Sequence, residues 1–236
     1  MHPFQDYERV YIINLASRKD RYREMSRELE RVGMLSNASP VRWFEAVRPS
    51  DAAGFPSIGA RGCFLSHLGV LENAHADGLQ RMLILEDDVN FCKGFGESFA
   101  ETNKELREKD WSLFYGGYAK QGQTFEFGDR AIAFASPDVE IMLAHFLGVR
   151  GDAIGELCDY LRRILTRPAG DPSGGPMHVD GAYGWYRREN PARQTYVSKV
   201  LLGMQRSSRT DIHDLRWFDR MPLVRELAQV ARRLKR

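Results

Sequence analysis

The chain has 236 residues, of which 43% are hydrophobic and 28% are charged, and its formal net charge is +2. This composition is ordinary for a globular protein and gives no reason to expect nucleic-acid binding. No apolar run reaches the roughly 18–20 residues of a membrane-spanning helix, and the first residues lack a secretory-signal pattern. The three cysteines are widely spaced, without a Cys-x-x-Cys pair. We therefore expect a reduced, cytoplasmic protein without a disulfide framework or a zinc knuckle.

The first ninety residues alternate between strand and helix patterns. Apolar runs predict strands over residues 9–15 and 41–47, and a third strand that starts at Arg81. Ser17 is expected to cap a helix that ends at Gly33, with Asp20 three residues after the cap. A loop rich in Gly, Pro and Ser over residues 49–62 precedes a helix over 63–76. This order predicts one α/β domain with a mostly parallel sheet flanked by helices.

The second half of the chain is less regular. Its patterns predict a helix over residues 95–109, a strand over 111–115, and a hairpin in the aromatic segment 124–134. A core strand over residues 141–149 and a helix over 152–165 follow. The segment 167–176 holds three prolines and three glycines, which predicts a loop.

Three consecutive carboxylates, Glu86, Asp87 and Asp88, end the third strand. Like charges this close repel one another, and the usual remedies are a raised pKa or a bound cation. Oxygen ligands suit Mn²⁺ or Mg²⁺. The alternative is a solvated acidic turn. Asn14 also ends a predicted strand, and ligands of parallel sheets gather beyond the carboxyl ends of the strands, so we expect a nucleotide site there.

Basic and polar residues near the other predicted strand ends are candidates for contacts with a phosphate or a base. Arg18, Arg21 and Arg61 offer guanidinium groups to a diphosphate or a uracil, although the first two can equally be solvated. Ser66 and His67 lie in the first turns of a helix, where backbone N–H groups favour phosphate. His67 can equally be a core residue, and Cys63 is interpreted as a packing residue.

Three segments resemble blocks of glycosyltransferase family 25, the lipooligosaccharide-biosynthesis type of transferase. They are Val10-Tyr11-Ile12-Ile13-Asn14-Leu15 with Arg18 and Arg21, Gly59-Ala60-Arg61-Gly62-Cys63-Phe64-Leu65-Ser66-His67, and Leu83-Ile84-Leu85-Glu86-Asp87-Asp88-Val89. Their order agrees with the family over residues 9–91. Two later segments, His178-Val179-Asp180 and Gln205-Arg206-Ser207-Ser208, are similar to later blocks. Before the second block, Ile58-Gly59-Ala60 replaces the commoner acidic residue.

The resemblance implies a GT-A-like fold and an inverting transfer of galactose or glucose from a UDP-sugar to a glycan acceptor such as lipooligosaccharide. The resemblance also implies that the carboxylates of the third block bind a metal ion. A Glu-x-Asp arrangement places its first and third side chains on one side of a strand, so we expect Asp88 to be the main metal ligand with Glu86 assisting. Asp87 would face the ribose hydroxyls or a neighbouring Arg.

Inversion needs a base that takes the proton of the acceptor hydroxyl, and Asp180 is our candidate. The alternative is that Asp180 caps a short helix. The aromatic residues that follow Asp180 are candidates either for sugar stacking or for the core; they are Tyr183, Trp185 and Tyr186. His178 is a candidate either for a metal ligand or for a structural role.

Residues 220–236 carry six basic side chains and one acid, about +5, so the rest of the chain is about −3. We expect residues 1–219 to form the GT-A-like domain and 220–236 a basic amphipathic helix. Such a helix can bind an anionic membrane next to a lipid-linked acceptor, or pack on the domain. Two functions from other classes stay open: a phospho-acceptor receiver domain, and a catalytically silent relative that acts as a binding module.

Overall fold

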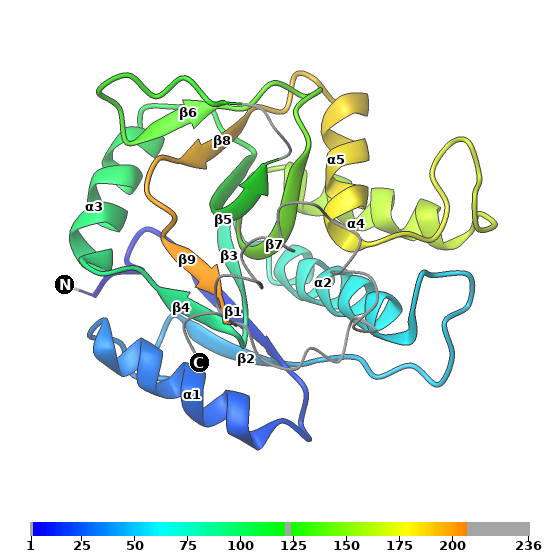
Figure 1. The fold of residues 1–236 in the computed structure, drawn as a ribbon, viewed down its shortest axis with the longest axis horizontal. Helices are drawn as coiled ribbons and strands as arrows, with labels where there is room; N and C mark the ends of the chain where they lie inside the picture. The colour runs from blue at the N-terminus through cyan, green and yellow to red at the C-terminus, as the bar shows by residue number, and fades with distance from the viewer. Residues whose placement is uncertain (1, 121–123, 207–236) are drawn as a thin grey trace, which may run out of the picture.

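The computed structural model describes residues 2–120 and 124–206, and in these ranges five helices surround a seven-stranded sheet (Figure 1). A two-stranded sheet lies beside it. The helices are α1 Lys19–Arg31, α2 Ile58–Ala76, α3 Phe95–Leu106, α4 Ala153–Leu165 and α5 Val179–Glu189. The large sheet contains β1 Arg9–Asn14, β2 Val41–Glu45, β3 Arg81–Glu86, β5 Leu113–Lys120, β6 Ile132–Phe134, β7 Ile141–Arg150 and β8 Thr195–Ser198. The small sheet pairs β4 Val89–Phe91 with β9 Gly203–Gln205.

The strand order of the large sheet is β2-β1-β3-β7-β5-β8-β6. Within the described ranges, β2, β1, β3, β5 and β8 run in one direction, while β7 and β6 run in the other. The predicted single α/β domain with a mostly parallel sheet is therefore confirmed.

Alternating side chains of β3 build the two hydrophobic layers. Met82 and Ile84 pack into the layer formed with α2, α4 and α5, and Leu83 and Leu85 into the layer formed with α1 and α3. All four side chains are fully buried. In Figure 1, α2, α4 and α5 lie to the right of the sheet and α1 and α3 to the left. The continuous apolar run before the acidic residues is thus explained by burial on both faces of the strand.

Two predicted helix starts are wrong. Helix α2 begins at Ile58, five residues before the predicted start, because the Ser57 hydroxyl accepts the Ala60 N–H at 2.9 Å and caps the helix. Helix α1 has Arg18 rather than Ser17 at its N-cap, without a side-chain cap bond. A Gly- and Ser-containing segment therefore holds the first turn of α2, where its composition indicated a loop.

The hairpin predicted over residues 124–134 is wrong. Only β6 forms there, and it pairs with β8 in antiparallel orientation. Phe125 and Phe127 instead pack from a loop against the core, and Phe125 meets Tyr118 edge-on at 5.4 Å between the ring centroids. The alternation of aromatic residues thus reflects loop packing.

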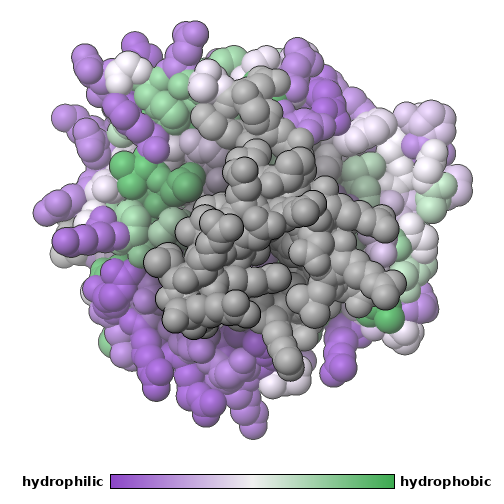
Figure 2. All heavy atoms as spheres, viewed as in Figure 1, coloured by the Kyte–Doolittle hydropathy of each residue, from purple (hydrophilic) through white to green (hydrophobic). Residues whose placement is uncertain are grey.

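The surface seen in Figure 2 is hydrophilic around most of its described rim. A smaller hydrophobic area lies on the left of this view, where the chain passes from β8 to β9. The exposed hydrophobic residues Val200, Leu201 and Met204 belong to that part of the chain. Among the described helices, none combines the length and the hydrophobicity that crossing a bilayer requires.

Two helical glycines provide a matched test of the packing between α2 and the loop after β2. A Cβ at Gly62 would lie 2.8 Å from the backbone oxygen of Val47, whereas one at Gly184 in α5 would meet nothing within 4 Å. We expect Gly62→Ala to lower the free energy of unfolding by about 1–3 kcal/mol through overpacking. Gly184→Ala should raise it by roughly 0.5–1 kcal/mol through helix propensity. Urea unfolding measures both, and equal effects would contradict the packing.

Candidate functional site

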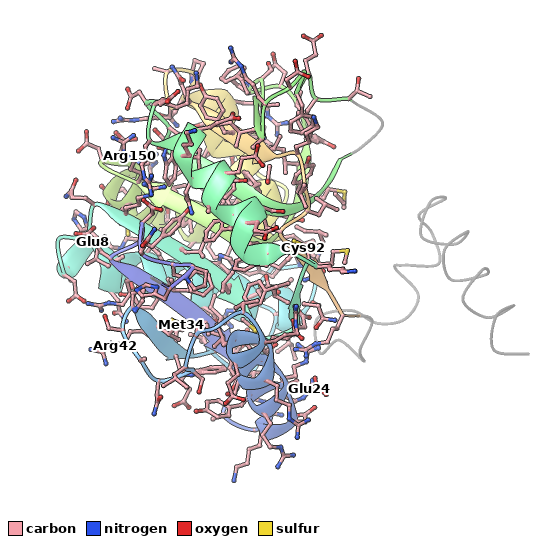
Figure 3. All side chains as sticks on the ribbon, turned by 90° about the vertical axis from the view of Figure 1, so that its left-hand side faces the viewer. Glu8, Glu24, Met34, Arg42, Cys92 and Arg150 are labelled. Carbon is pink, nitrogen blue, oxygen red and sulfur yellow. The ribbon has the colours of Figure 1, made fainter. Side chains whose placement is uncertain are left out.

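The candidate site lies at the carboxyl edge of β1 and β3. The register pairs Ile13 with Glu86, so Asn14 and Asp87 follow side by side. The Asn14 Nδ2 donates to Asp87 Oδ2 at 2.7 Å. In Figure 3, Glu8 and Arg150 mark the opposite, amino edge of these strands on the left of the view. Cys92, which follows the acidic residues shortly in the sequence, lies on the right of the view.

Arg21, in the first turns of α1, supplies a buried positive charge to this edge. Its Nη1 lies 2.9 Å from Asp87 Oδ1 and 3.5 Å from Asp88 Oδ2. Asp87 therefore faces a neighbouring Arg, one of the two environments expected for it. One guanidinium contacts two of the three consecutive carboxylates, and the third, Glu86, lies on the other side of the turn.

Asp88 carries negative charge that its described surroundings only partly balance. The residue is 3% exposed, and its Oδ1 has no hydrogen-bond partner among the described residues. Burial, followed by the charge of Glu86, raises the pKa of Asp88 to about 7, although Arg21 opposes the shift. Burial also raises the pKa of Asp87, against the effects of Arg21 and Asn14. An additional cation at Asp88 would relieve this cost.

Glu86 is the last residue of β3, and its side chain is 14% exposed. Its Oε1 lies 3.6 Å from His67 Nε2, and its Oε2 accepts Gln205 Nε2 at 3.3 Å. Burial disfavours the charge on Glu86, but His67, His145 and Arg21 outweigh it and lower its pKa. Asp87 and Asp88 form a turn after the strand, so the expected strand alternation does not extend to Asp88. The charge of Glu86 nevertheless acts directly on Asp88.

Helix α2 carries Cys63 and His67 toward the end of β3 and Ser66 toward the loop after β2. Because α2 begins at Ile58, Ser66 and His67 lie in its third turn, and their predicted place in the first turns of a helix is wrong. The His67 ring is fully buried, with Nδ1 3.0 Å from the Tyr183 hydroxyl. Ser66 is also fully buried; its Oγ donates to the Gly62 oxygen at 2.6 Å and accepts the Val47 N–H at 2.9 Å. Burial, then the charges of Glu86, Asp180 and Asp88, raises the pKa of the Cys63 thiol well above its usual value.

Asp180 lies near the same cluster, since its charge acts on Cys63. It is the second residue of α5, and the N-cap is His178, so the alternative that Asp180 caps this helix is wrong. Its Oδ2 accepts the Leu143 N–H at 3.1 Å, and its Oδ1 accepts the Gly181 N–H at 2.9 Å. Leu143 has a left-handed φ of 72°. This hydrogen bond joins the start of α5 to β7.

The other predicted residues either pair with a nearby carboxylate or pack in the core. Arg18 forms an ion pair with Asp20 at 2.8 Å, and Arg61 one with Asp51 at 2.6 Å. Tyr183 and Tyr186 are buried, at 0% and 1% exposure, and Trp185 is partly buried against the core. For Tyr183 and Tyr186 the alternative of a core position therefore holds, because the hydrophobic layer beneath α5 encloses them, whereas stacking on the partly buried Trp185 stays a prediction.

Sequence reasoning missed three residues of the site. The buried His145 of β7 places Nε2 3.0 Å from the Gly203 oxygen. The Arg206 backbone N–H donates to the Asp88 oxygen at 2.8 Å, and its Nη2 donates to the Asp87 oxygen at 2.6 Å. Gln205, which contacts Glu86, is the third. Gln205 and Arg206 belong to a segment that resembled a later family block, whereas no sequence pattern indicated His145.

Two cavities that the described residues line lie away from the acidic residues. One, of about 270 Å³, is bounded by Arg9, Tyr11 and Asp77. Because Arg9 begins β1 and Asn14 ends it, this cavity is at the opposite edge of the sheet. The other, of about 140 Å³, lies by Thr102 and Lys199.

The segment that contains the acidic residues is similar to known proteins. Residues 56–136, which contain α2 and all three acids, match the model of glycosyltransferase family 25 (LPS biosynthesis protein). Procollagen galactosyltransferase 1 of Danio rerio is 30% identical over 132 residues. This segment of the chain is therefore similar to glycosyltransferase family 25. The expected resemblance to this family is confirmed.

The family 25 relatives are much longer than their match to this chain. The match to the Danio rerio protein covers 47% of the chain and 21% of the relative. An inactive glycosyltransferase 25 family member 3 of Homo sapiens is 28% identical, over 47% of the chain and 22% of that protein. A solved glycosyltransferase involved in glycosylation of the major capsid of PBCV-1 has a TM-score of 0.47 and 14% identity, and the match covers 80% of each chain.

The buried charge balance can be tested with two arginines of the first family block. Arg21→Met should lower the free energy of unfolding by about 3 kcal/mol, because Asp87 and Asp88 stay buried without their cation. Arg18→Met removes the ion pair with Asp20, which is half exposed, and should cost less than about 1 kcal/mol. Chemical denaturation measures the difference. Equal losses would show that Arg21 does not compensate the acids.

Proposed function

We propose that this chain is a metal-dependent, inverting glycosyltransferase with a GT-A-like fold that transfers a hexose, galactose or glucose, from a UDP-sugar to a glycan such as lipooligosaccharide. The observation that carries the proposal is the buried Asp88 carboxylate, whose Oδ1 has no partner among the described residues, next to Glu86 at the carboxyl edge of the sheet. This edge is where parallel sheets bind ligands. The family match includes the whole acidic segment.

The donor set fits Mn²⁺ or Mg²⁺. Asp88 and Glu86 would hold the ion through carboxylate oxygens, which hard divalent cations prefer. When bound, the ion neutralises the charge that develops on a departing diphosphate. Arg21 already occupies one side of Asp88, at 3.5 Å, so the orphaned Oδ1 is the oxygen left for a metal. The Asp87 carboxylate already contacts Asn14 and Arg21, so its proposed role is to hold this arrangement in place.

The remaining basic and polar residues are proposed to serve the donor in different ways. Asn14 and Arg21 orient Asp87, and Arg18 at the N-cap of α1 and Arg61 in the first turn of α2 are proposed to approach the diphosphate or the uracil. Ser66 acts through the backbone, because its hydroxyl fastens the loop after β2 to α2. In this proposal the partly exposed Arg18 and Arg61 neutralise the charge of the donor, and the buried Arg21 positions Asp87.

Asp180 is proposed as the base that takes the proton of the acceptor hydroxyl. The residue is partly exposed, so an acceptor can reach it. The Leu143 and Gly181 N–H groups donate to its two oxygens and hold the carboxyl group in place. The sugar then receives the deprotonated hydroxyl on the face opposite the diphosphate.

The acceptor side is proposed from the sequence. A glycan or a lipid-linked saccharide at the inner face of the plasma membrane agrees with the basic segment 220–236, which lies outside the described residues. The boundary at residue 219 lies outside them as well. Contact with an anionic membrane and a cytoplasmic location therefore remain predictions.

A catalytically silent binding module is the second candidate, because the chain also matches a family member named inactive over 47% of its length. Incubation with UDP-glucose or UDP-galactose and Mn²⁺, with UDP release as the readout, separates the two functions: turnover supports the enzyme. The family match over residues 56–136 favours a glycosyltransferase over a receiver domain.

Metal-dependent donor binding gives the first test. UDP with Mn²⁺ at about 100 times its Kd should stabilise the protein by roughly 2.7 kcal/mol, seen as a raised Tm. Asp88→Asn should remove this shift while unfolding, without ligand, at a temperature no lower than the wild type, because an uncompensated buried charge is gone. Asp159→Asn on α4, whose side chain is 69% exposed, is the control. A preserved shift in Asp88→Asn would contradict the metal site.

The role of Asp180 gives the second test. Asp180→Asn should reduce kcat by about 10²–10⁴-fold, since the amide keeps an oxygen for the Leu143 N–H but cannot take a proton. The UDP and Mn²⁺ thermal shift should stay unchanged, which separates the loss of a base from a loss of folding. A variant with wild-type kcat would exclude Asp180 as the base.

A further inference from the structure

Three side chains of different chemistry converge at the end of β3. Cys63 Sγ, His67 Nε2 and one oxygen of Glu86 all lie within 4.8 Å of one another. Cys63 and His67 are four residues apart on α2, so both point from one face of the helix. Glu86 Oε1 lies 4.0 Å from the sulfur and 3.6 Å from the imidazole nitrogen. The helix and the strand end therefore enclose one point between a thiol, an imidazole and a carboxylate.

The His67 ring has an unsatisfied nitrogen that is aimed at this point. The residue has no exposed surface, and its Nε2 has no hydrogen-bond partner among the described residues. The other ring nitrogen lies 3.0 Å from the Tyr183 hydroxyl. A hydrogen bond from Nδ1–H to that oxygen leaves the Nε2 lone pair directed at Glu86. Metal-binding histidines characteristically have their second nitrogen held in this way.

The separations agree with ligands of one ion better than with hydrogen bonds. Bonds of about 2.0–2.3 Å from a tetrahedral metal place neighbouring ligand atoms roughly 3.3–3.7 Å apart. The nitrogen–oxygen separation of 3.6 Å lies in that range, and the sulfur–oxygen separation of 4.0 Å exceeds it by a few tenths of an ångström. An N–H···O hydrogen bond is shorter, about 2.9 Å.

We propose that Cys63, His67 and Glu86 form a binding site for a thiophilic transition-metal ion of the Zn²⁺ class. Thiolate, imidazole and carboxylate are the ligands that Zn²⁺ takes in proteins, and three protein ligands leave a fourth position open. Mn²⁺ and Mg²⁺ favour oxygen ligands and are expected at Asp88 instead. On binding, the Cys63 thiol releases its proton to solvent and the sulfur bonds the metal as thiolate.

Glu86 belongs to both sites, which gives the new site a consequence for the proposed function. An ion bound between Cys63 and His67 would hold Glu86 Oε1 where it already lies, 3.6 Å from His67 Nε2, and keep it from a metal at Asp88, so Zn²⁺ should compete with Mn²⁺-supported donor binding. This consequence rests on the proposed function. The existence of the site itself rests only on the geometry of α2 and β3.

Titration of the full chain with Co²⁺, a spectroscopic substitute for Zn²⁺, tests the site. We expect a near-ultraviolet thiolate-to-cobalt absorption band that saturates at one ion per chain and disappears when Zn²⁺ is added. Cys63→Ser, which is nearly isosteric and should fold, must lose this band. Cys92→Ser, a free thiol after β4, is the control and must keep it.

Two results would overturn the proposal. One is the absence of a thiolate band in the wild type, which would leave His67 and Glu86 as an internal polar pair. The other is a band that Cys63→Ser retains, which would place the ion elsewhere. Because the readout is the absorption of the bound ion, a failure to detect hexose transfer leaves it unaffected. The two proposals can therefore fail separately.

Discussion

Burial of Asp87 and Asp88 beside the Arg21 guanidinium, directly after the partly buried Glu86, is the constraint on which the rest of the site depends. Asp87 and Asp88 are 6% and 3% exposed, and Arg21 contacts both. Asn14, the Arg206 backbone and the two hydrophobic layers around β3 hold this arrangement in place. Repulsion between Glu86 and Asp88 is not relieved by any of them. The fold thus maintains an electrostatic cost at one edge of its sheet, which proteins usually retain where a ligand carries opposite charge.

The sequence predicted the first half of the fold well, for a physical reason. Strands buried on both faces, such as β3, have apolar runs that local pattern reveals, and β1 and β2 were placed within two residues of their ends. The second half depends on contacts distant in sequence. Antiparallel insertion of β7 between β3 and β5 and the pairing of β6 with β8 have no local signal. The aromatic residues of the 124–134 segment therefore misled the prediction.

The candidate site divides in the same way. Consecutive carboxylates at a strand end can be recognised in the sequence because like charges this close repel one another. The partners that decide their behaviour are not visible, since Arg21, His67 and His145 reach Glu86 and its neighbours from three separate elements. Cys63 illustrates the limit: its helical position explains its burial, but only the convergence of α2 with β3 puts its sulfur beside an imidazole and a carboxylate. The family resemblance indicated the segment that contains Gln205 and Arg206, which no spacing pattern indicated, but it did not assign these residues to the site.

The reversed direction of β7 has a consequence for the kind of groups that this edge can offer. Each parallel neighbour reaches this edge with its last residues, so the side chains at or just after the end of a strand, such as Asn14 at the end of β1 and Asp87 after β3, define what it presents there. A strand that enters from this edge presents its first residues and their amide hydrogens. Leu143 uses one of these donors on Asp180, and His145 follows two residues later. One inverted strand thus lets the beginning of a chain segment, rather than its end, fix a carboxylate at this edge of the sheet.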